Sequence, residues 1–132
     1  MHGSAFTYIT QFLKWKAELG MKRIEVIVPD RKLKDANEVI RDANTGGMSY
    51  YRIEGRGGIK AESASFERGA KNYTPEFISR IKVEVVIKDE QVEELVNNLL
   101  DKLGDELGGK IFILDVHTAI DLNTRMRGEA VI

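Results

Sequence analysis

The chain has 132 residues, of which 20 are Lys or Arg and 21 are Asp or Glu, so its formal net charge is −1. This length indicates one domain, and the balanced charge excludes the strong positive field that attracts nucleic acid or anionic membranes. The absence of cysteine excludes disulfide bonds and cysteine-based zinc sites and fits a cytoplasmic protein. No apolar run approaches the ~20 residues of a membrane-spanning helix, so we expect no membrane insertion.

Residues 1–20 form a segment of their own. Its apolar side chains recur at helical spacing: Phe6, Ile9, Leu13 and Ala17. This spacing predicts an amphipathic helix that docks on the domain or on a neighbouring subunit. A helix on a membrane surface and a chain that starts at Met21 are the alternatives. We therefore divide the chain into an extension, residues 1–20, and a domain, residues 21–132.

The first half of the domain has the pattern strand, helix, strand. Residues 22–29 alternate between β-branched and polar side chains and end at a proline, which predicts a strand. Asp30 is a candidate helix cap, and apolar residues recur every three or four positions over 33–43. We expect the glycine pair at 46–47 to end this helix. Residues 48–55, rich in aromatic side chains, are predicted to form a second strand.

The second half repeats the pattern. The alternation over 77–87 is the clearest strand signal in the chain. Asp89 is a candidate cap for a helix with a nearly ideal apolar stripe, and Gly104 is its expected stop. Residues 110–116 are predicted to form a fourth strand, and the mixed tail, 117–132, a short strand or an extended arm.

This order predicts an α+β fold, the ferredoxin-like βαββαβ sandwich, with an antiparallel sheet and both helices on one face. Val86 and the region of Tyr50 and Tyr51 indicate that the other face is partly apolar, which favours self-association. The segment 55–77, between the second and third strands, has neither helical nor strand periodicity. A tight hairpin would suffice there, so the length of this loop indicates a function.

Four stretches of the domain carry a resemblance to a known family: MKRIEVIVP, GGMSYYRIEGRGG, RIKVEVVIKDEQVEEL and GGKIFILDV. From Met21 onward the chain resembles the PII signal-transduction proteins, the nitrogen regulatory proteins P-II, and its YTPEF resembles archaeal members. The resemblance implies a homotrimer that is a regulator and not an enzyme. It also implies that the long loop is the family's T-loop, which reaches into partners such as an ammonium transporter or a nitrogen-assimilation enzyme.

The resemblance further implies an adenine nucleotide (ATP, ADP or AMP) in clefts between subunits. The expected nucleotide-binding residues are Ile27, Ser49, Gly55, Arg56, Gly57, Gly58, Glu84, Val86, Gly108, Gly109, Lys110 and Arg125. Of these, Glu84 and Val86 are expected on a strand edge beside the base. Backbone N–H groups next to glycines, together with a lysine, can bind an anion. Without the resemblance, ordinary turn glycines and a solvated lysine explain the same residues.

Four more residues take expected roles from the resemblance. Arg80 and Lys60 are candidates for binding a carboxylate effector, which in the family is 2-oxoglutarate. Arg68 is a candidate partner contact in the T-loop, with a solvated charge as the alternative. Tyr73 aligns with a tyrosine that some relatives modify, with a half-buried structural tyrosine as the alternative.

The chain also departs from the family pattern. Asp121 and Asn123 stand where the family has an arginine pair that binds the triphosphate, and Arg125 and Arg127 are the nearest substitutes. A carboxylate in place of a cation reverses the local charge. Ile59 replaces a glutamine that helps to hold magnesium, so magnesium is at most an accessory ion. We therefore expect altered nucleotide use, with AMP or ADP preferred over ATP.

Two other functions compete with this one. A divergent PII-like module could sense another ligand, such as bicarbonate, or act as a protein-binding scaffold. A small enzyme has little support, because the histidines, His2 and His117, lie in different segments and no nucleophile and base can be paired. For the same reason we expect no metal site.

Overall fold

The computed structural model of the chain describes residues 20–56, 76–104 and 108–132. Its strands and helices are β1 (Met21–Val28), α2 (Leu33–Asp42), β2 (Met48–Gly55), β3 (Ile78–Lys88), α3 (Val92–Leu103) and β4 (Lys110–Asp115). Short 3-10 turns lie at Asp30–Lys32, Asp89–Gln91 and Glu129–Val131. The elements follow the predicted order, and the strand ends differ from those predicted by one residue or so. Pro29 lies outside β1 because a proline has no N–H to give to a sheet.

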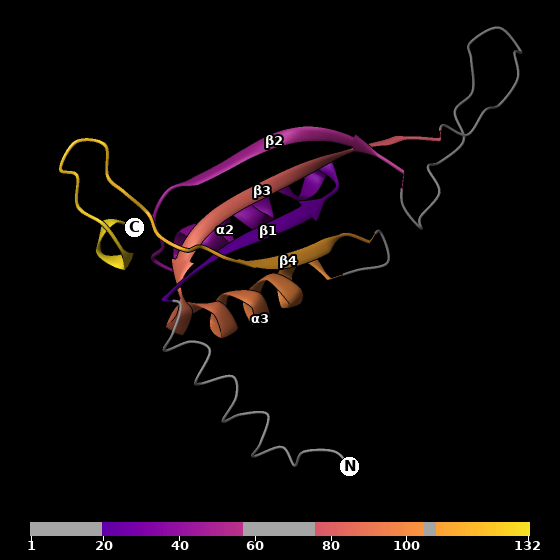
Figure 1. The fold of residues 1–132 in the computed structure, drawn as a ribbon. Helices are drawn as coiled ribbons and strands as arrows, with labels where there is room; N and C mark the ends of the chain where they lie inside the picture. The colour runs from indigo at the N-terminus through magenta and orange to yellow at the C-terminus, as the bar shows by residue number, and fades with distance from the viewer. Residues whose placement is uncertain (1–19, 57–75, 105–107) are drawn as a thin grey trace, which may run out of the picture.

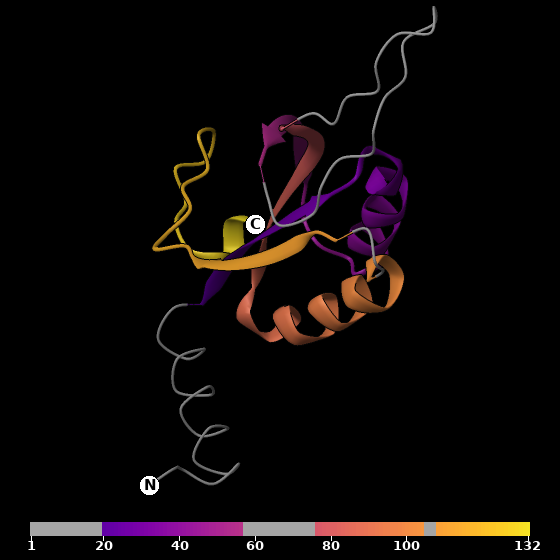
Figure 2. The same cartoon turned by 90° about the vertical axis from the view of Figure 1, so that its right-hand side faces the viewer.

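The strands form one four-stranded sheet in the order β2-β3-β1-β4, with every neighbouring pair antiparallel. Both helices lie on one face of the sheet and leave the other face open (Figures 1 and 2). This is the ferredoxin-like sandwich that the order of elements predicts. Of the extension, residues 1–20, the first nineteen lie outside the described residues.

The core lies between the sheet and the two helices. Its buried members alternate along the strands and recur at helical spacing in the helices: Ile24, Val26, Val28, Ala36, Ile40, Ile81, Val83, Val85, Ile87, Val92, Leu95, Leu99 and Leu103. Burying one such aliphatic side chain stabilises the fold by about 1.5–3 kcal/mol. The predicted faces of β3 and α3 are therefore confirmed.

The open face of the sheet is partly apolar, as predicted, and it also carries charged side chains: Val86 pairs there with Arg23, and Phe112 with Glu25. Tyr51 does lie there, but Tyr50 pairs with Val83 of the core and so belongs to the helix-covered face. Glu25 accepts a hydrogen bond of 3.0 Å from Nε of Arg23 and lies 3.2 Å from Nζ of Lys82. Burial alone would raise the pKa of Glu25, but the two cations together hold it below its ordinary value.

The predictions for both ends of α2, the cap at its start and the glycine stop at its end, are wrong. The carboxylate of Asp30 does not cap the helix, because it accepts a hydrogen bond of 2.8 Å from the Arg52 guanidinium. The helix also ends before the glycine pair at 46–47. Asn44 takes the left-handed conformation, with φ of +57°, and its N–H donates to the carbonyl of Arg41. Asparagine tolerates this conformation nearly as well as glycine does.

Gly104 ends α3 as predicted, but for a steric reason. Its backbone is extended, and a Cβ there would lie 2.6 Å from the carbonyl oxygen of Leu100. The Gly104 N–H donates to that same oxygen at 2.9 Å. The position therefore requires glycine because the two backbone segments approach closely.

Asp89 was predicted to cap α3, but it is buried and forms an ion pair instead. Its carboxylate pairs at 2.7 Å with Nζ of Lys22, which is fully buried and also lies 3.7 Å from Asp115. The turn before α3 is closed instead by Gln91, whose side-chain oxygen accepts the N–H of Lys88. The Lys22–Asp89 pair thus ties the start of β1 to the start of α3.

Candidate functional site

The base of the long loop lies at one end of the sheet. Gly55, the last residue of β2, is paired with Ile78, the first residue of β3, so both ends of the loop leave side by side (Figure 1). One of the predicted nucleotide-binding residues, Arg56, donates a hydrogen bond of 2.8 Å to the carboxylate of Glu76. This exposed ion pair joins the two sides of the loop base.

Some of the predicted site residues lie outside the described part of the chain: Gly57, Gly58, Lys60, Arg68 and Tyr73. The same holds for Ile59. Arg80, the other predicted effector-binding residue, lies on β3 opposite Ile53, close to the loop base. Its guanidinium donates to the carbonyl of Ser79 at 3.1 Å.

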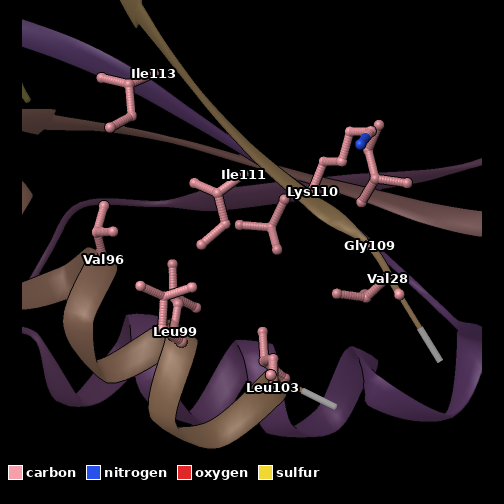
Figure 3. Close-up of a pocket in the computed structure, with 13 residues that line it drawn as sticks. Val28, Val96, Leu99, Leu103, Gly109, Lys110, Ile111 and Ile113 are labelled. Carbon is pink, nitrogen blue, oxygen red and sulfur yellow. The ribbon is translucent and has the colours of Figure 1, made fainter. Parts of the chain in front are cut away.

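A first hollow lies between α3 and the strands β1 and β4, and we call it the α3–β4 hollow. Its volume is about 340 Å³, and its lining is mainly apolar: Val26, Val28, Val96, Leu99, Leu100, Leu103, Ile111 and Ile113. Four predicted nucleotide-binding residues also line it, namely Ile27, Gly108, Gly109 and Lys110. Figure 3 shows the Lys110 amine on the far side of β4 from Leu99 and Leu103. The hollow thus has an apolar floor and a cationic rim.

The glycines at the start of β4 have a backbone that other residues rarely adopt. Gly108 has φ of +80° and Gly109 φ of +136°, and a Cβ on Gly109 would collide with the backbone oxygen of Ile27. The fold alone therefore requires glycine at position 109. Gly55 is different, because its φ is ordinary and no heavy atom among the described residues lies within 4 Å of a Cβ built there. Its lack of a side chain is not explained by the packing of one chain.

A second hollow, which we call the β2–β3 hollow, lies at the other end of these strands. It also measures about 340 Å³, and its lining includes three predicted nucleotide-binding residues, Ser49, Glu84 and Val86. The prediction that Glu84 lies on a strand edge is wrong, because β3 is an inner strand and Glu84 is flanked by Ser49 and Glu25. Val86 does lie at an open corner, since β2 begins at Met48, opposite Val85.

The β2–β3 hollow contains residues that the sequence did not point to. Arg23 lines it, and so do Val131 and Ile132 at the end of the chain. The alternation of β1 could have placed Arg23 on the open face, next to Glu25. No local pattern could have placed Val131 and Ile132, because their position depends on the path of the whole tail.

The tail does not bring its predicted residue to either hollow. Arg125 lies in a turn with φ of +63° and is not among the residues that line the two hollows. Asp121 accepts hydrogen bonds from the N–H groups of Thr124 and Asn123, each 2.8 Å long. These bonds hold the pKa of Asp121 below its ordinary value.

The described residues offer neither a metal cluster nor a membrane span. Within 20–56, 76–104 and 108–132, no three His, Asp or Glu side chains are grouped as a metal ion would require. None of the helices in these ranges is long and apolar enough to cross a membrane. The two hollows and the loop base are therefore the features to be explained.

Comparison with protein families gives one match that spans most of the chain. A family model described as "Nitrogen regulatory protein P-II" matches residues 21–126. A protein of that name from Pasteurella multocida (strain Pm70) is 34% identical over 114 residues, which cover 83% of this chain and 97% of that protein. The one from Cereibacter sphaeroides is 37% identical over the same shares of both chains. Nitrogen regulatory protein P-II 1 from Escherichia coli (strain K12) is 32% identical over its full length.

Solved structures resemble the fold described above. The crystal structure of Arabidopsis thaliana PII bound to citrate has a TM-score of 0.67 and 23% sequence identity, and it covers 88% of this chain and 95% of that one. The structure of B. subtilis GlnK has a TM-score of 0.66 and 19% identity, with 86% and 99% of the two chains covered. At these identities the likeness concerns the fold.

Proposed function

Because the chain belongs to the nitrogen regulatory protein P-II family, whose members are signal-transduction regulators, we propose that it is a cytoplasmic homotrimer that senses adenine nucleotides. The nucleotide binds between subunits, and the loop between β2 and β3 carries the signal to a partner protein. An ammonium transporter or a nitrogen-assimilation enzyme is the proposed partner. No nucleic acid takes part.

One observation carries this proposal: the predicted nucleotide-binding residues are divided between two separate hollows. Ile27 lies in the α3–β4 hollow, and Val86 lies in the β2–β3 hollow. Val86 pairs with Arg23, and Ile27 is four residues further along β1, a separation of about 13 Å along the strand. Neither hollow has the whole set of residues. Two copies that place the α3–β4 hollow of one against the β2–β3 hollow of the next would complete it.

The chemistry of the two hollows suits the two ends of a nucleotide. The phosphate is proposed to bind to Lys110 and to the backbone N–H groups of Gly108 and Gly109, which line the same hollow and have no side chains to keep an anion away. In the other hollow, Val86 offers an apolar surface to the base, and Ser49 and Glu84 offer hydrogen-bonding groups to its edge. Gly55 supports this proposal as well, because an uncovered glycine lets a ligand approach the backbone closely.

Charge near the tail favours AMP or ADP over ATP. The position at which relatives place a cation is occupied by Asp121, whose carboxylate is engaged by two backbone N–H groups. A third phosphate would add negative charge near this carboxylate without the cation that normally offsets it. Magnesium could lessen this repulsion, as an accessory ion.

A divergent PII-like module that senses another ligand, such as bicarbonate, or that acts as a scaffold is the second candidate. The charge reversal at Asp121 favours it, because that change weakens the binding of any polyanion. A small anion would need only Lys110 and the glycine N–H groups before β4.

The test is titration calorimetry of the purified protein with ATP, ADP, AMP and cyclic AMP. We expect heat with at least one nucleotide, its loss in Lys110→Ala, and its retention in Lys102→Ala. Lys102 is the matched control because it is an exposed lysine near the end of α3 that does not line the hollow. A folded protein that gives no heat with any nucleotide, but gives heat with bicarbonate, would replace the first candidate by the second.

A further inference from the structure

The α3–β4 hollow leaves large apolar side chains uncovered on both of its walls. Ile113 of β4 pairs with Ile24 of the core, so it faces the helices, and Figure 3 shows it across the hollow from Val96 of α3. Its exposed fraction is nevertheless 46%, and that of Leu100, on the α3 wall, is 55%. Exposed apolar side chains on the two walls of one hollow indicate that a further apolar segment packs there.

The chain enters the domain at one end of this hollow. The carbonyl of Gly20 accepts the N–H of Asp89 at 3.0 Å, in the turn that precedes α3, and the carbonyl of Met21 accepts the N–H of Val116 at 3.3 Å, just after β4. The starts of β1 and α3 lie at the same end of the sheet (Figure 1). Residues 1–19 lie outside the described residues and outside the range of the family model, but they are therefore joined to the domain between the two walls of the hollow.

Gly20 has a backbone conformation that commonly follows the last residue of a helix. Its φ is +76°, in the left-handed region that glycine adopts without strain. The helical spacing of the extension predicts a helix that would end at this glycine. A chain that reverses its direction there lies antiparallel to α3. Residues 6–19 would span about 21 Å as a helix, and the twelve residues of α3 span about 18 Å, so the extension is long enough to cover the hollow.

The two segments have matching side chains when both are counted from the hydrogen bond between Gly20 and Asp89. Four residues of α3 lie 4, 7, 11 and 14 positions after Asp89: Glu93, Val96, Leu100 and Leu103. Four residues of the extension lie 4, 7, 11 and 14 positions before Gly20: Lys16, Leu13, Ile9 and Phe6. Because two helices rise by the same amount per residue, antiparallel packing brings each member of one set opposite a member of the other. The match gives three apolar pairs and one pair of opposite charge.

Charge favours the same orientation. Lys14 and Lys16 stand near the end of the extension, and the first turn of α3 carries Glu93 and Glu94, which are both exposed. In the antiparallel arrangement these opposite charges lie at the same end of the hollow. Each set also suits its own helix, since cations are favoured at the C-terminal end of a helix and carboxylates at the N-terminal end. The complementary charges thus select one direction of docking.

We propose that residues 6–19 form a helix that docks antiparallel to α3 in the α3–β4 hollow of the same chain, with Ile9 against Leu100. This contact requires neither a trimer nor a nucleotide. The amine of Lys110 lies on the far side of β4 from Leu99 (Figure 3), so the docked helix leaves it accessible to an anion. The extension is thus a third helix on the face of the sheet that carries α2 and α3.

Cross-linking tests the contact directly, because the chain has no cysteine of its own. The full chain carrying Ile9→Cys and Leu100→Cys is treated with a short bifunctional maleimide, and the products are separated under denaturing conditions and identified by peptide mass spectrometry. We expect a link within one chain, in a product of monomer mass. Ile9→Cys with Asn98→Cys is the matched control, because Asn98 is an exposed residue of α3 that does not line the hollow. Its yield of the internal link should be several-fold lower.

A second measurement does not depend on the cross-link. The thiol of Leu100→Cys alone should react slowly with a monofunctional maleimide, because the extension covers it. Adding Ile9→Glu should raise the reaction rate several-fold, whereas Gln11→Glu, which adds the same charge on the opposite side of the predicted helix, should leave it unchanged. Lys16→Glu should raise the rate as well, and Glu93→Lys in the same chain should restore the slow reaction.

Three results would overturn the proposal. Equal internal linking of Ile9→Cys to Leu100→Cys and to Asn98→Cys would show that the extension has no fixed place on α3. Links found only between chains would assign the extension to a second copy. A Leu100→Cys rate that Ile9→Glu leaves unchanged, in a chain that sediments with phosphatidylglycerol vesicles, would assign the extension to a membrane surface. Calorimetry with nucleotides separates this contact from the proposed function, since an internally linked chain that gives no heat contradicts only nucleotide sensing.

Discussion

Arg56 and Glu76 form an ion pair of 2.8 Å across the base of the long loop, where β2 and β3 part. Both side chains are exposed, so the pair contributes less than about 1 kcal/mol to stability. Glu76 instead competes with a bound phosphate for the Arg56 guanidinium. We expect Glu76→Gln to raise nucleotide affinity several-fold and Arg56→Gln to lower it, as measured by calorimetry.

The control for that prediction is a second exposed pair of the same length. Arg52 and Asp30 also lie 2.8 Å apart, and neither lines the α3–β4 or the β2–β3 hollow. Asp30→Asn should leave the affinity unchanged. If it raises the affinity as much as Glu76→Gln does, the effect comes from net charge and not from the release of Arg56.

Two glycines should respond in opposite ways to the same substitution. Gly109→Ala places a Cβ against the backbone oxygen of Ile27 at a φ of +136°, which should cost about 1–3 kcal/mol of stability. Gly55→Ala meets no described atom within 4 Å, so it should leave the melting temperature unchanged or slightly higher. We nevertheless expect Gly55→Ala to lose nucleotide binding. A Gly55→Ala protein that binds as tightly as the wild type would contradict the proposed approach of a ligand to this strand end.

Removing one partner of the buried Lys22–Asp89 pair should lower the free energy of unfolding strongly, whereas replacing both partners by apolar residues should lower it little. Lys22→Ala leaves the Asp89 carboxylate buried without its 2.7 Å partner, and we expect a loss of about 3–5 kcal/mol in the free energy of unfolding. The double change to Met at 22 and Leu at 89 removes both charges and should cost much less. Urea denaturation at one protein concentration measures both. A double variant less stable than Lys22→Ala would show that the pair itself stabilises the fold.

Acid should destabilise the protein through Glu25. The cations Lys82 and Arg23 hold the pKa of Glu25 below its ordinary value in the folded state. Its stabilising contribution is therefore present above the unfolded pKa of about 4.3 and is lost as pH falls through the lower folded pKa. Melting temperatures between pH 6 and 3 should fall less steeply for Glu25→Gln than for the wild type. Asp121 has a lowered pKa as well, so Asp121→Asn should reduce the slope further.

At the alkaline end the sign is reversed. Hydrogen bonding to Glu25 and to Tyr51 raises the pKa of Lys82 in the folded state. This contribution is fully present below the unfolded pKa of about 10.4 and is lost as pH rises through the higher folded pKa. A Lys82→Met protein should therefore show a flatter fall in melting temperature above pH 10, and an unchanged fall would contradict the role of this ion pair.

The sequence indicated candidate site residues, but not their arrangement. Ile27 and Lys110 line one hollow, and Ser49 and Glu84 line the other, while their role in nucleotide binding stays a prediction. Their division between two hollows could not be predicted, because it depends on which strand each residue pairs with. The turn around Asp121 could not be predicted either, since its carboxylate accepts hydrogen bonds from the N–H groups of Asn123 and Thr124 in a conformation that no periodicity indicates.

The sequence by itself determined the elements and the fold class, because strand alternation at Ile81–Ile87 and the helical stripe from Val92 to Leu103 depend only on neighbours along the chain. The tertiary structure alone decided which of Tyr50 and Tyr51 faces the helices, and it alone buried Asp89 against Lys22, 67 residues away. The register of the sheet determines which tyrosine faces the helices, and a long-range contact determines that Asp89 is buried. They are set by the packing of the whole chain, since a strand shifted by one residue turns every side chain to the other face.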